Sequence, residues 1–159
     1  MKGKRIVIVS LFFLVVVMSC SSVRSTLTKV ETLDGNVYDA IELINAGPHH
    51  QLRIAKIENN RFIMYVRVAA SGRPGSLIMT IDGERQNLIN HNDWELYAVD
   101  AQGSGWRGNV LLSENVVTSL LKANSVNIRI VNAWGGPMSR DQGVDISNVL
   151  PQLKNFLEQ

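Results

Sequence analysis

The sequence predicts a mainly β protein: a single antiparallel β-sandwich-like domain with two or three short helices, one of them at the C-terminus. The chain has 159 residues, of which 45% are hydrophobic and 19% are charged, so one globular domain is expected. Between residues 51 and 131, short runs rich in Ile, Val, Leu and aromatic residues alternate with turn residues. The last segment instead repeats its apolar residues at helical spacing.

The first 19 residues have the composition of a secretory signal peptide. Basic residues at the start precede an apolar run over residues 6–18. As a helix this run would be about 20 Å long, too short for a bilayer core about 30 Å thick. Its removal takes away three of the 16 Lys and Arg residues and leaves 13 against 14 acidic residues. Such a near-neutral domain offers no basic surface for phosphate, so no nucleic acid partner is expected.

The apolar run ends in Val17-Met18-Ser19-Cys20, which resembles the lipobox of bacterial lipoproteins. The resemblance implies cleavage between Ser19 and Cys20, diacylglycerol on the Cys20 sulfur and an acyl chain on the freed amine. Membrane lipid is then a partner, and the protein belongs to the bacterial cell envelope. Ser21, and not Asp, follows the cysteine, which resembles lipoproteins sent to the outer membrane. A secreted protein with an ordinary cleavage site near Cys20 is the alternative.

Residues 20–28 are rich in Ser and Thr and lack apolar periodicity. We expect them to form the acylated N-terminus and a flexible tether. The folded domain is then expected at residues 29–159. Asp34-Gly35 could then turn a small hairpin. The spacing of Asp39 and Glu42 resembles a capping box, which predicts a short helix over 40–46.

The body of the chain predicts a series of strands joined by turns. Residues 58–60 separate the first two, and Asp82-Gly83 favours a type I′ turn because both of its central positions need positive φ. A glycine-rich loop is expected over residues 102–105. The predicted strands are residues 52–57, 62–68, 77–81, 94–99, 109–112 and 126–131, with a short last one around Val144 and Ile146.

Two helices complete the prediction. Ser113 is the expected cap of the first, whose apolar face holds Val116, Val117, Leu120 and Leu121. Ser147 is the expected cap of the terminal helix, and Pro151 is tolerated within its first turn. The terminal helix must cover a sheet through a stripe of Leu150, Leu153, Phe156 and Leu157.

The last 40 or so residues are similar to the end of the secreted invasion-associated locus B family, where a helix, a strand, a glycine turn, another strand and a final helix close a β-sandwich. Residues 120–122, 126–130 and 146–157 carry the similarity, which covers about a third of the chain. That family's cysteine pair is absent here. The resemblance implies the architecture and an envelope role, and it transfers no functional residues.

Several patterns suggest an enzyme, and each has a simpler explanation. Gly103-Ser-Gly105-Trp-Arg-Gly108 has the letters of a dinucleotide-binding fingerprint, but a strand-like segment follows it where a helix is required. A glycine-rich hairpin loop is therefore expected there. A Ser-His-Asp hydrolase is possible by residue count, but the sequence has no G-x-S-x-G motif.

The histidines are the only candidates for a metal site. His49, His50, His91 and Asp93 could gather around zinc, but adjacent histidines on a strand point to opposite faces, so only one of the first two could join His91. Solvated loop histidines are the preferred interpretation. No metal and no other cofactor is expected.

Trp94, Trp106 and Trp134 all lie at predicted junctions of loops and strands. If they gathered at one end of the sandwich, they would form a candidate binding surface for a glycan or a protein. Packing of Trp94 and Trp106 against the ends of the core is the preferred alternative. Trp134 precedes Gly135-Gly136-Pro137 and is expected to be the most exposed of the three.

The sequence thus predicts a non-catalytic, membrane-anchored envelope lipoprotein, which serves as a binding or structural module at the outer membrane. A small envelope hydrolase or metal-dependent enzyme is one alternative, and a surface lipoprotein that binds a glycan or a host protein is another. Titratable side chains that converge in a deep pocket would favour the enzyme. A flat aromatic patch without such groups would favour the binding protein.

Overall fold

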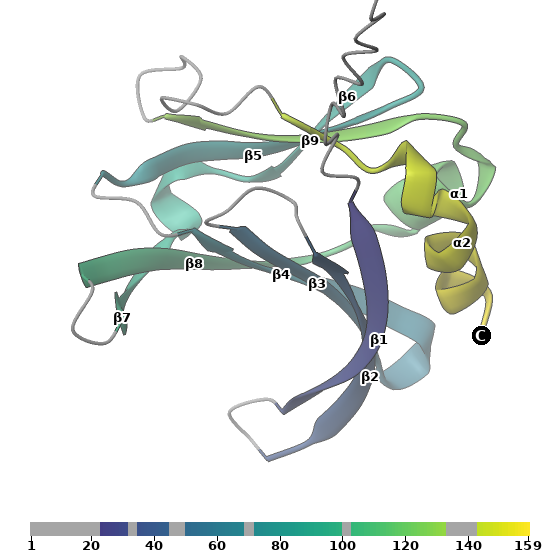
Figure 1. Ribbon diagram of the computed structural model, residues 1–159, viewed down its shortest axis with the longest axis horizontal. Coiled ribbons are helices and arrows are strands. Elements are labelled where there is room, and N and C mark those ends of the chain that lie inside the picture. Colours follow the sequence, from purple (N-terminus) through teal and green to yellow (C-terminus); the bar gives the residue numbers. More distant parts are fainter. Residues whose placement is uncertain (1–22, 32–34, 45–49, 69–71, 100–102, 133–142) are drawn as a thin grey trace, which may run out of the picture.

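Two antiparallel β-sheets pack face to face, and two helices cover one end of the resulting sandwich (Figure 1). The computed structural model describes residues 23–31, 35–44, 50–68, 72–99, 103–132 and 143–159. The mainly β, sandwich-like fold with a C-terminal helix is confirmed. No helix in these ranges is long and apolar enough to cross a membrane.

The larger sheet has six strands, and each strand runs antiparallel to its neighbours. The first four follow one another in sequence, and two later strands complete the sheet beyond them. In spatial order they are β1 (Arg24–Glu31), β2 (Val37–Ile44), β3 (His50–Ile57), β4 (Arg61–Val68), β8 (Gly103–Leu111) and β7 (Glu95–Val99).

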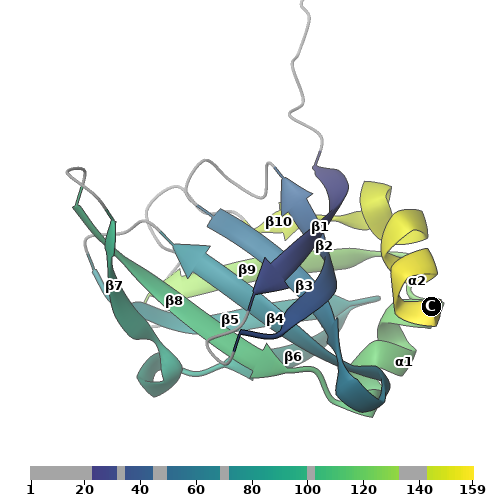
Figure 2. The same cartoon turned by 90° about the horizontal axis from the view of Figure 1, so that it is seen from below.

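The smaller sheet has four strands and lies across the inner face of the larger one (Figure 2). In spatial order they are β10 (Val144–Asp145), β9 (Val126–Asn132), β5 (Pro74–Ile81) and β6 (Glu84–Ile89). The helices α1 (Glu114–Lys122) and α2 (Leu150–Glu158) stand at the same end of the sandwich. Three short 3-10 turns connect elements: η1 (Glu58–Asn60), η2 (His91–Asp93) and η3 (Ser147–Val149).

The core forms where the alternating apolar residues of the two sheets meet. Along β4, Met64, Val66 and Val68 are at most 1% exposed, and along β5 Leu77 and Met79 are fully buried. Each such side chain contributes about 1.5–3 kcal/mol through the apolar surface it removes from water. The alternation expected over residues 126–131 is confirmed, because every second residue of that strand is buried, and residues 62–68 alternate in the same way.

The predicted turns are also confirmed. Asp82 and Gly83 have φ values of 46° and 90°, as a type I′ turn requires, and they connect β5 to β6. Asn59 and Asn60 have φ values of 60° and 55° between β3 and β4. At the start of α1, the Ser113 hydroxyl accepts a hydrogen bond from the Val116 N–H at 3.3 Å, which confirms the predicted cap.

The helix predicted over residues 40–46 is wrong, because residues 37–44 form β2. This strand pairs with β1 on one side and β3 on the other, and Ile41 and Leu43 enter the core at 1% exposure each. The spacing of Asp39 and Glu42 is a local signal of small free energy, and strand pairing on both edges outweighs it.

The flexible tether predicted over residues 20–28 is corrected by the structure. Val23 is 5% exposed, and its carbonyl accepts a hydrogen bond from the Asn148 side chain at 2.6 Å. Residues 24–28 then pair with β2 along the edge of the larger sheet. An edge strand is held by backbone hydrogen bonds, so its side chains need no apolar alternation. The folded domain therefore includes Val23, and residues 20–22 lie outside the described residues.

Ser147 does not cap the terminal helix as predicted. Its hydroxyl accepts a hydrogen bond from the Val126 N–H at 3.1 Å and donates one to the Asp145 carboxylate. This hydroxyl and the Ser147 N–H lower the pKa of Asp145 below its ordinary value. The predicted apolar stripe of α2 is nevertheless confirmed, because its four members are at most 6% exposed. Ser147 thus connects β9 to β10, and α2 is held by its buried face.

Replacing Phe156 with Ala is expected to destabilise the protein by about 3–5 kcal/mol, because its ring is 2% exposed and packs edge-on against Phe62 at 6.1 Å. Urea denaturation gives the difference in free energy of unfolding. Gln152→Ala, at an exposed position of the same helix, is the matched control and should change it by less than about 0.5 kcal/mol. Equal values for the two variants would mean that α2 is not part of the core.

Asp82 is expected to make stability depend on acid pH. The N–H groups of Ser125 and Asn124 donate to its carboxylate at 2.8 Å and 2.9 Å and hold its pKa below the ordinary value of 3.8. A lowered folded-state pKa stabilises the protein fully above the unfolded pKa, and this stabilisation disappears as the pH falls through the folded pKa. Asp82→Asn keeps an acceptor oxygen and tolerates positive φ, but it cannot ionise.

The melting temperature of the wild type should therefore fall more steeply than that of Asp82→Asn between about pH 5 and pH 2. Asp39→Asn, at an exposed position of β2, is the control for loss of a surface charge. Parallel curves for the wild type and Asp82→Asn would contradict a role for this carboxylate.

Candidate binding site

A hollow of about 590 Å³ lies on the outer face of the six-stranded sheet. Its floor is made by β3, β4 and β8, and its rims by the end of β1 on one side and by β7 on the other. In Figure 1 the β1–β2 hairpin curves below the sheet and faces β7 and β8 across this space. Side chains on the floor and rims include Gln51, Arg53, Tyr65, Arg67, Glu95, Arg107 and Asn109.

Strand register places these side chains in two cross-strand rows. In the first row, Arg53 lies opposite Tyr65, which lies opposite Asn109. In the second row, Gln51, Arg67, Arg107 and Glu95 face one another in that order across β3, β4, β8 and β7. Because successive strand residues point to opposite faces, the buried residues between them send these side chains outward.

An ion pair lies at the β2 end of the first row. The Arg53 Nη2 donates to both Glu42 carboxylate oxygens, at 3.2 Å and 3.4 Å. Glu42 lies directly opposite Arg53 on β2, and the two side chains are 20% and 29% exposed, respectively. Charge-assisted bonds in such a half-buried place hold the guanidinium in a fixed orientation. The Arg53 Nε is buried and has no hydrogen-bond partner among the described residues.

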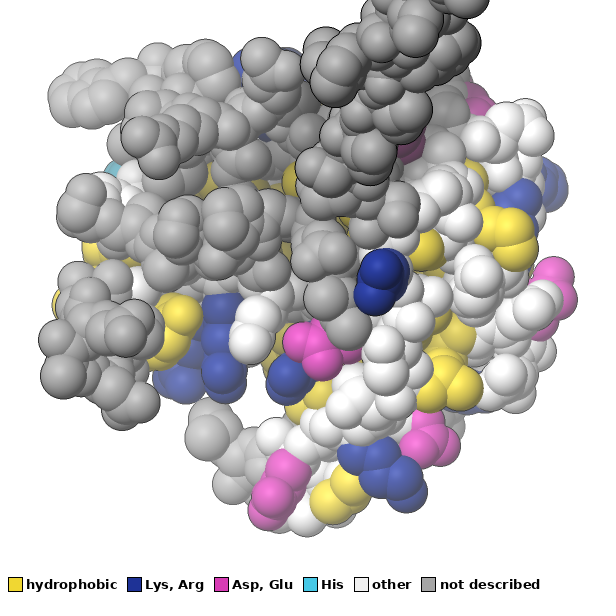
Figure 3. All heavy atoms as spheres, in the orientation of Figure 1, with side chains coloured by type: hydrophobic (Ala, Val, Ile, Leu, Met, Phe, Trp, Pro, Cys, Tyr) yellow, Lys and Arg dark blue, Asp and Glu magenta, His cyan; other side chains and the backbone are white. Residues whose placement is uncertain are grey.

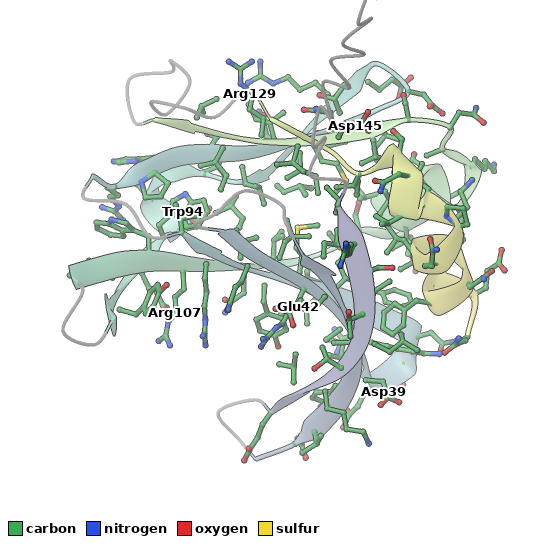
Figure 4. All side chains as sticks on the ribbon, in the orientation of Figure 1. Asp39, Glu42, Trp94, Arg107, Arg129 and Asp145 are labelled. Atoms are coloured by element: carbon green, nitrogen blue, oxygen red, sulfur yellow. The ribbon has the colours of Figure 1, made fainter. Side chains whose placement is uncertain are left out.

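A second ion pair lies at the other end of the hollow. The Arg107 Nε donates to Glu95 Oε2 at 2.9 Å, between β8 and β7. These side chains are 44% and 65% exposed, so solvent screens the pair and its contribution to stability is at most about 1 kcal/mol. Figure 4 shows Arg107 extending from β8 into the space below the sheet.

Arg67 stands between these two pairs and differs from both. It lies directly opposite Arg107, and like charges in that position repel. Among the described residues, no carboxylate lies within ion-pair distance of Arg67. Its guanidinium instead lies 5.7 Å from the centre of the Tyr97 ring, in a cation–π contact. Figure 3 shows the resulting patch of basic side chains beside the hairpin.

Gly105 explains how Tyr97 reaches this place. The two residues are direct neighbours on β8 and β7, and a Cβ on Gly105 would lie 2.8 Å from two atoms of the Tyr97 ring. The predicted glycine loop is therefore wrong over residues 103–108, which belong to β8. Glycine removes the side chain that would collide with the ring. On the inner face, Gly108 similarly leaves room for Trp94, 3.1 Å from where its Cβ would stand.

Neither of the two described tryptophans, Trp94 and Trp106, lines the hollow. Trp94 is 3% exposed and donates its indole N–H to the Gly75 carbonyl at 3.0 Å, which corresponds to the core-packing alternative. Trp106 is half-buried against the core, with the Arg73 guanidinium 5.4 Å from its ring centre. Trp134 lies outside the described residues. Trp94 is thus unavailable to a surface, so the candidate aromatic surface does not include it, as the preferred core-packing alternative predicts.

The histidine candidates have structural contacts where they are described. One ring nitrogen of His91, Nδ1, lies 2.8 Å from the Pro74 carbonyl, and the Asp93 carboxylate accepts from the Asn90 N–H at 3.1 Å. His49 and the side chain of His50 lie outside the described part of the chain. Within that part, no group of three or more His, Cys, Asp or Glu side chains is placed to hold a metal ion.

The charged residues of the hollow were not among the candidates predicted from the sequence. Arg67 and Tyr65 were visible only as the polar positions of a strand whose other positions are apolar. Arg107 and Gly105 fall within the glycine pattern, which predicts a glycine-rich hairpin loop and not a strand. The sequence does show Arg and Tyr on the exposed faces of predicted strands. It does not show the register of β3, β4, β8 and β7, which brings these side chains together.

The chain matches no protein-family model, no curated protein and no solved structure. The similarity of its last 40 or so residues to the invasion-associated locus B family therefore stays a prediction.

Gly105→Ala is expected to push the Tyr97 ring off β8, because the added Cβ would otherwise lie 2.8 Å from that ring. Tyr97 is only half-buried and can move toward solvent, so the free energy of unfolding should change by less than about 1 kcal/mol. NMR should show the Arg67 side-chain resonances losing the ring-current shift of Tyr97. Unchanged Arg67 resonances would contradict this arrangement.

Proposed function

We propose that this protein is a non-catalytic binding module of the bacterial cell envelope, anchored at the outer membrane through acylated Cys20. Its ligand site is the hollow on the outer face of the six-stranded sheet. The observation that carries this proposal is the set of three arginines, Arg53, Arg67 and Arg107, held on paired strands around one concavity. A site on paired strands is preorganised, which lowers the entropy cost of binding.

The ion pairs of the hollow support binding over hydrolysis. Acid–base catalysis needs a side chain that is free to exchange a proton with the substrate. Glu42 and Glu95 instead each accept hydrogen bonds from an arginine. These carboxylates are placed to orient guanidinium groups.

The position of Val23 supports close contact between the domain and the bilayer. Its side chain is buried and its carbonyl is held by Asn148, so the fold begins three residues after Cys20. Three extended residues span at most about 11 Å. With an acyl anchor at Cys20, the start of β1 would therefore lie next to the lipid headgroups.

The hollow would stay clear of those headgroups. β1 begins at Arg24 and ends at Glu31, which lines the rim of the hollow. A strand of this length spans about 25 Å, so β1 would separate the anchored end of the domain from the ligand site. Figure 2 shows β1 running across the outer face of the sheet.

Cys20→Ala is expected to abolish acylation and release the protein into the soluble fraction. Each buried CH₂ contributes about 0.8 kcal/mol to membrane binding, so two or more acyl chains hold the protein stably at the membrane. A protein without acyl chains has no such anchor. Cells fed an alkynyl fatty acid should label the wild type and the control Ser22→Ala, but not Cys20→Ala. Full sedimentation of Cys20→Ala with membranes after a high-salt wash would overturn the proposed anchor.

A further inference from the structure

We propose that the hollow binds an acidic saccharide, and that Arg67 and Arg107 hold the carboxylate of that ligand. The inference rests on the proposed function, because it takes the hollow to be the ligand site. Its volume of about 590 Å³ falls within the range of roughly 300–1,000 Å³ usual for small-molecule sites.

The charges of the hollow are incompletely paired: Glu31 lines its rim, but no ion pair joins it to Arg67 in the described part of the structure. Arg53 has Glu42 and Arg107 has Glu95, whereas no described carboxylate pairs with Arg67. Arg67 also stands directly opposite Arg107, and of these two arginines only Arg107 has a carboxylate partner among the described residues. An anion bound between them would replace a repulsive contact with two attractive ones. The site therefore favours a ligand that brings a negative charge to this point.

The donors that remain suit a carboxylate. Arg107 contacts Glu95 through Nε, and in the described part of the structure no acceptor is bonded to its two Nη groups. Arg67 is exposed and is positioned by the Tyr97 ring, which contacts its guanidinium without accepting its N–H groups in ordinary hydrogen bonds. A planar guanidinium matches the two oxygens of a carboxylate with parallel N–H bonds.

The neighbours of this arginine pair suit the rest of a sugar. Gln51 lies opposite Arg67, and Asn109 lies opposite Tyr65, so amide groups stand on both sides of the guanidinium groups. An amide both donates and accepts, as each hydroxyl of a saccharide does. Tyr65 and Tyr97 add aromatic rings that can pack against the apolar faces of a sugar.

The location on a sheet face favours a saccharide over an extended peptide. A peptide commonly adds to the edge of a sheet, where unpaired backbone groups bind its main chain. The floor of the hollow is formed by β3, β4 and β8, and each of these strands pairs with a neighbour on both sides. Recognition there must come from side chains, and the described lining combines three arginines with two amides, Tyr65 and the carboxylates of Glu31 and Glu95.

The test compares trigalacturonate with its fully methyl-esterified form, using the mature acylated protein in non-ionic detergent. The two trisaccharides share their ring hydroxyls and differ in charge. Isothermal titration calorimetry should show at least tenfold tighter binding of the acid, and NMR should place the shifts at Arg67, Arg107 and Asn109. A second acidic sugar, 3′-sialyllactose, and its neutral partner lactose form a parallel pair.

Arg67→Gln should reduce the affinity for trigalacturonate at least tenfold, to that of the methyl ester. Arg85→Gln is the matched control, because it removes the same charge from an exposed position of β6 on the other sheet and should leave the affinity unchanged. Glu95→Gln should tighten binding, since it frees Arg107 from its carboxylate partner.

Four outcomes would overturn the inference. The acid and the ester could bind equally, Arg67→Gln and Arg85→Gln could have the same effect, or neither acidic sugar could bind. Tighter binding of tetraglutamate than of both acidic sugars would also overturn it, in favour of an acidic peptide. In that case shifts at the hollow would preserve the proposed function, and the Cys20→Ala experiment tests the membrane anchor independently of every sugar.

Discussion

The alternation of side chains along β4 and β8 is the constraint on which both the core and the hollow depend. Met64, Val66 and Val68 must face the smaller sheet, because their burial supplies the apolar contacts between the two layers. A strand has a period of two, so Tyr65 and Arg67 are forced to the opposite face. Slipping β4 by one residue would bury Arg67 and expose Met64, so the stability of the core also fixes the polar site.

The two rows of the hollow combine rigid and adjustable parts. Arg53 is held by Glu42 in a half-buried ion pair, whereas Arg107 and Arg67 are more exposed and can reorient. Gly105 lets Tyr97 lie flat across β8 and reach Arg67. The strands supply positions fixed by backbone pairing, and the exposed guanidinium groups supply adjustment to a ligand. Val23, which is buried just before β1, is separated from this site by the length of that strand.

The errors in the sequence-based prediction share one physical cause. Residues 40–46 carry a local helix signal, residues 24–28 carry no periodic signal, and residues 103–108 carry a loop signal. Yet residues 40–44, 24–28 and 103–108 all lie in strands. Each is held by hydrogen bonds to another strand, and two of the three belong to strands with neighbours on both sides. Local propensity contributes little free energy compared with such long-range pairing. The residues of a segment do not by themselves identify the strand with which it pairs.

The sequence by itself determined the class of fold, the turns at Asp82-Gly83 and Asn59-Asn60, the cap at Ser113 and the buried stripe of α2. These features depend on residues close together in the chain, whose φ preference, capping or helical spacing is a local property. Only the tertiary structure decided that Arg53, Arg67 and Arg107 surround one hollow, that Arg67 opposes Arg107, and that Tyr97 lies over Gly105. These neighbours come from strands far apart in sequence, and a shift of one residue in register would separate them.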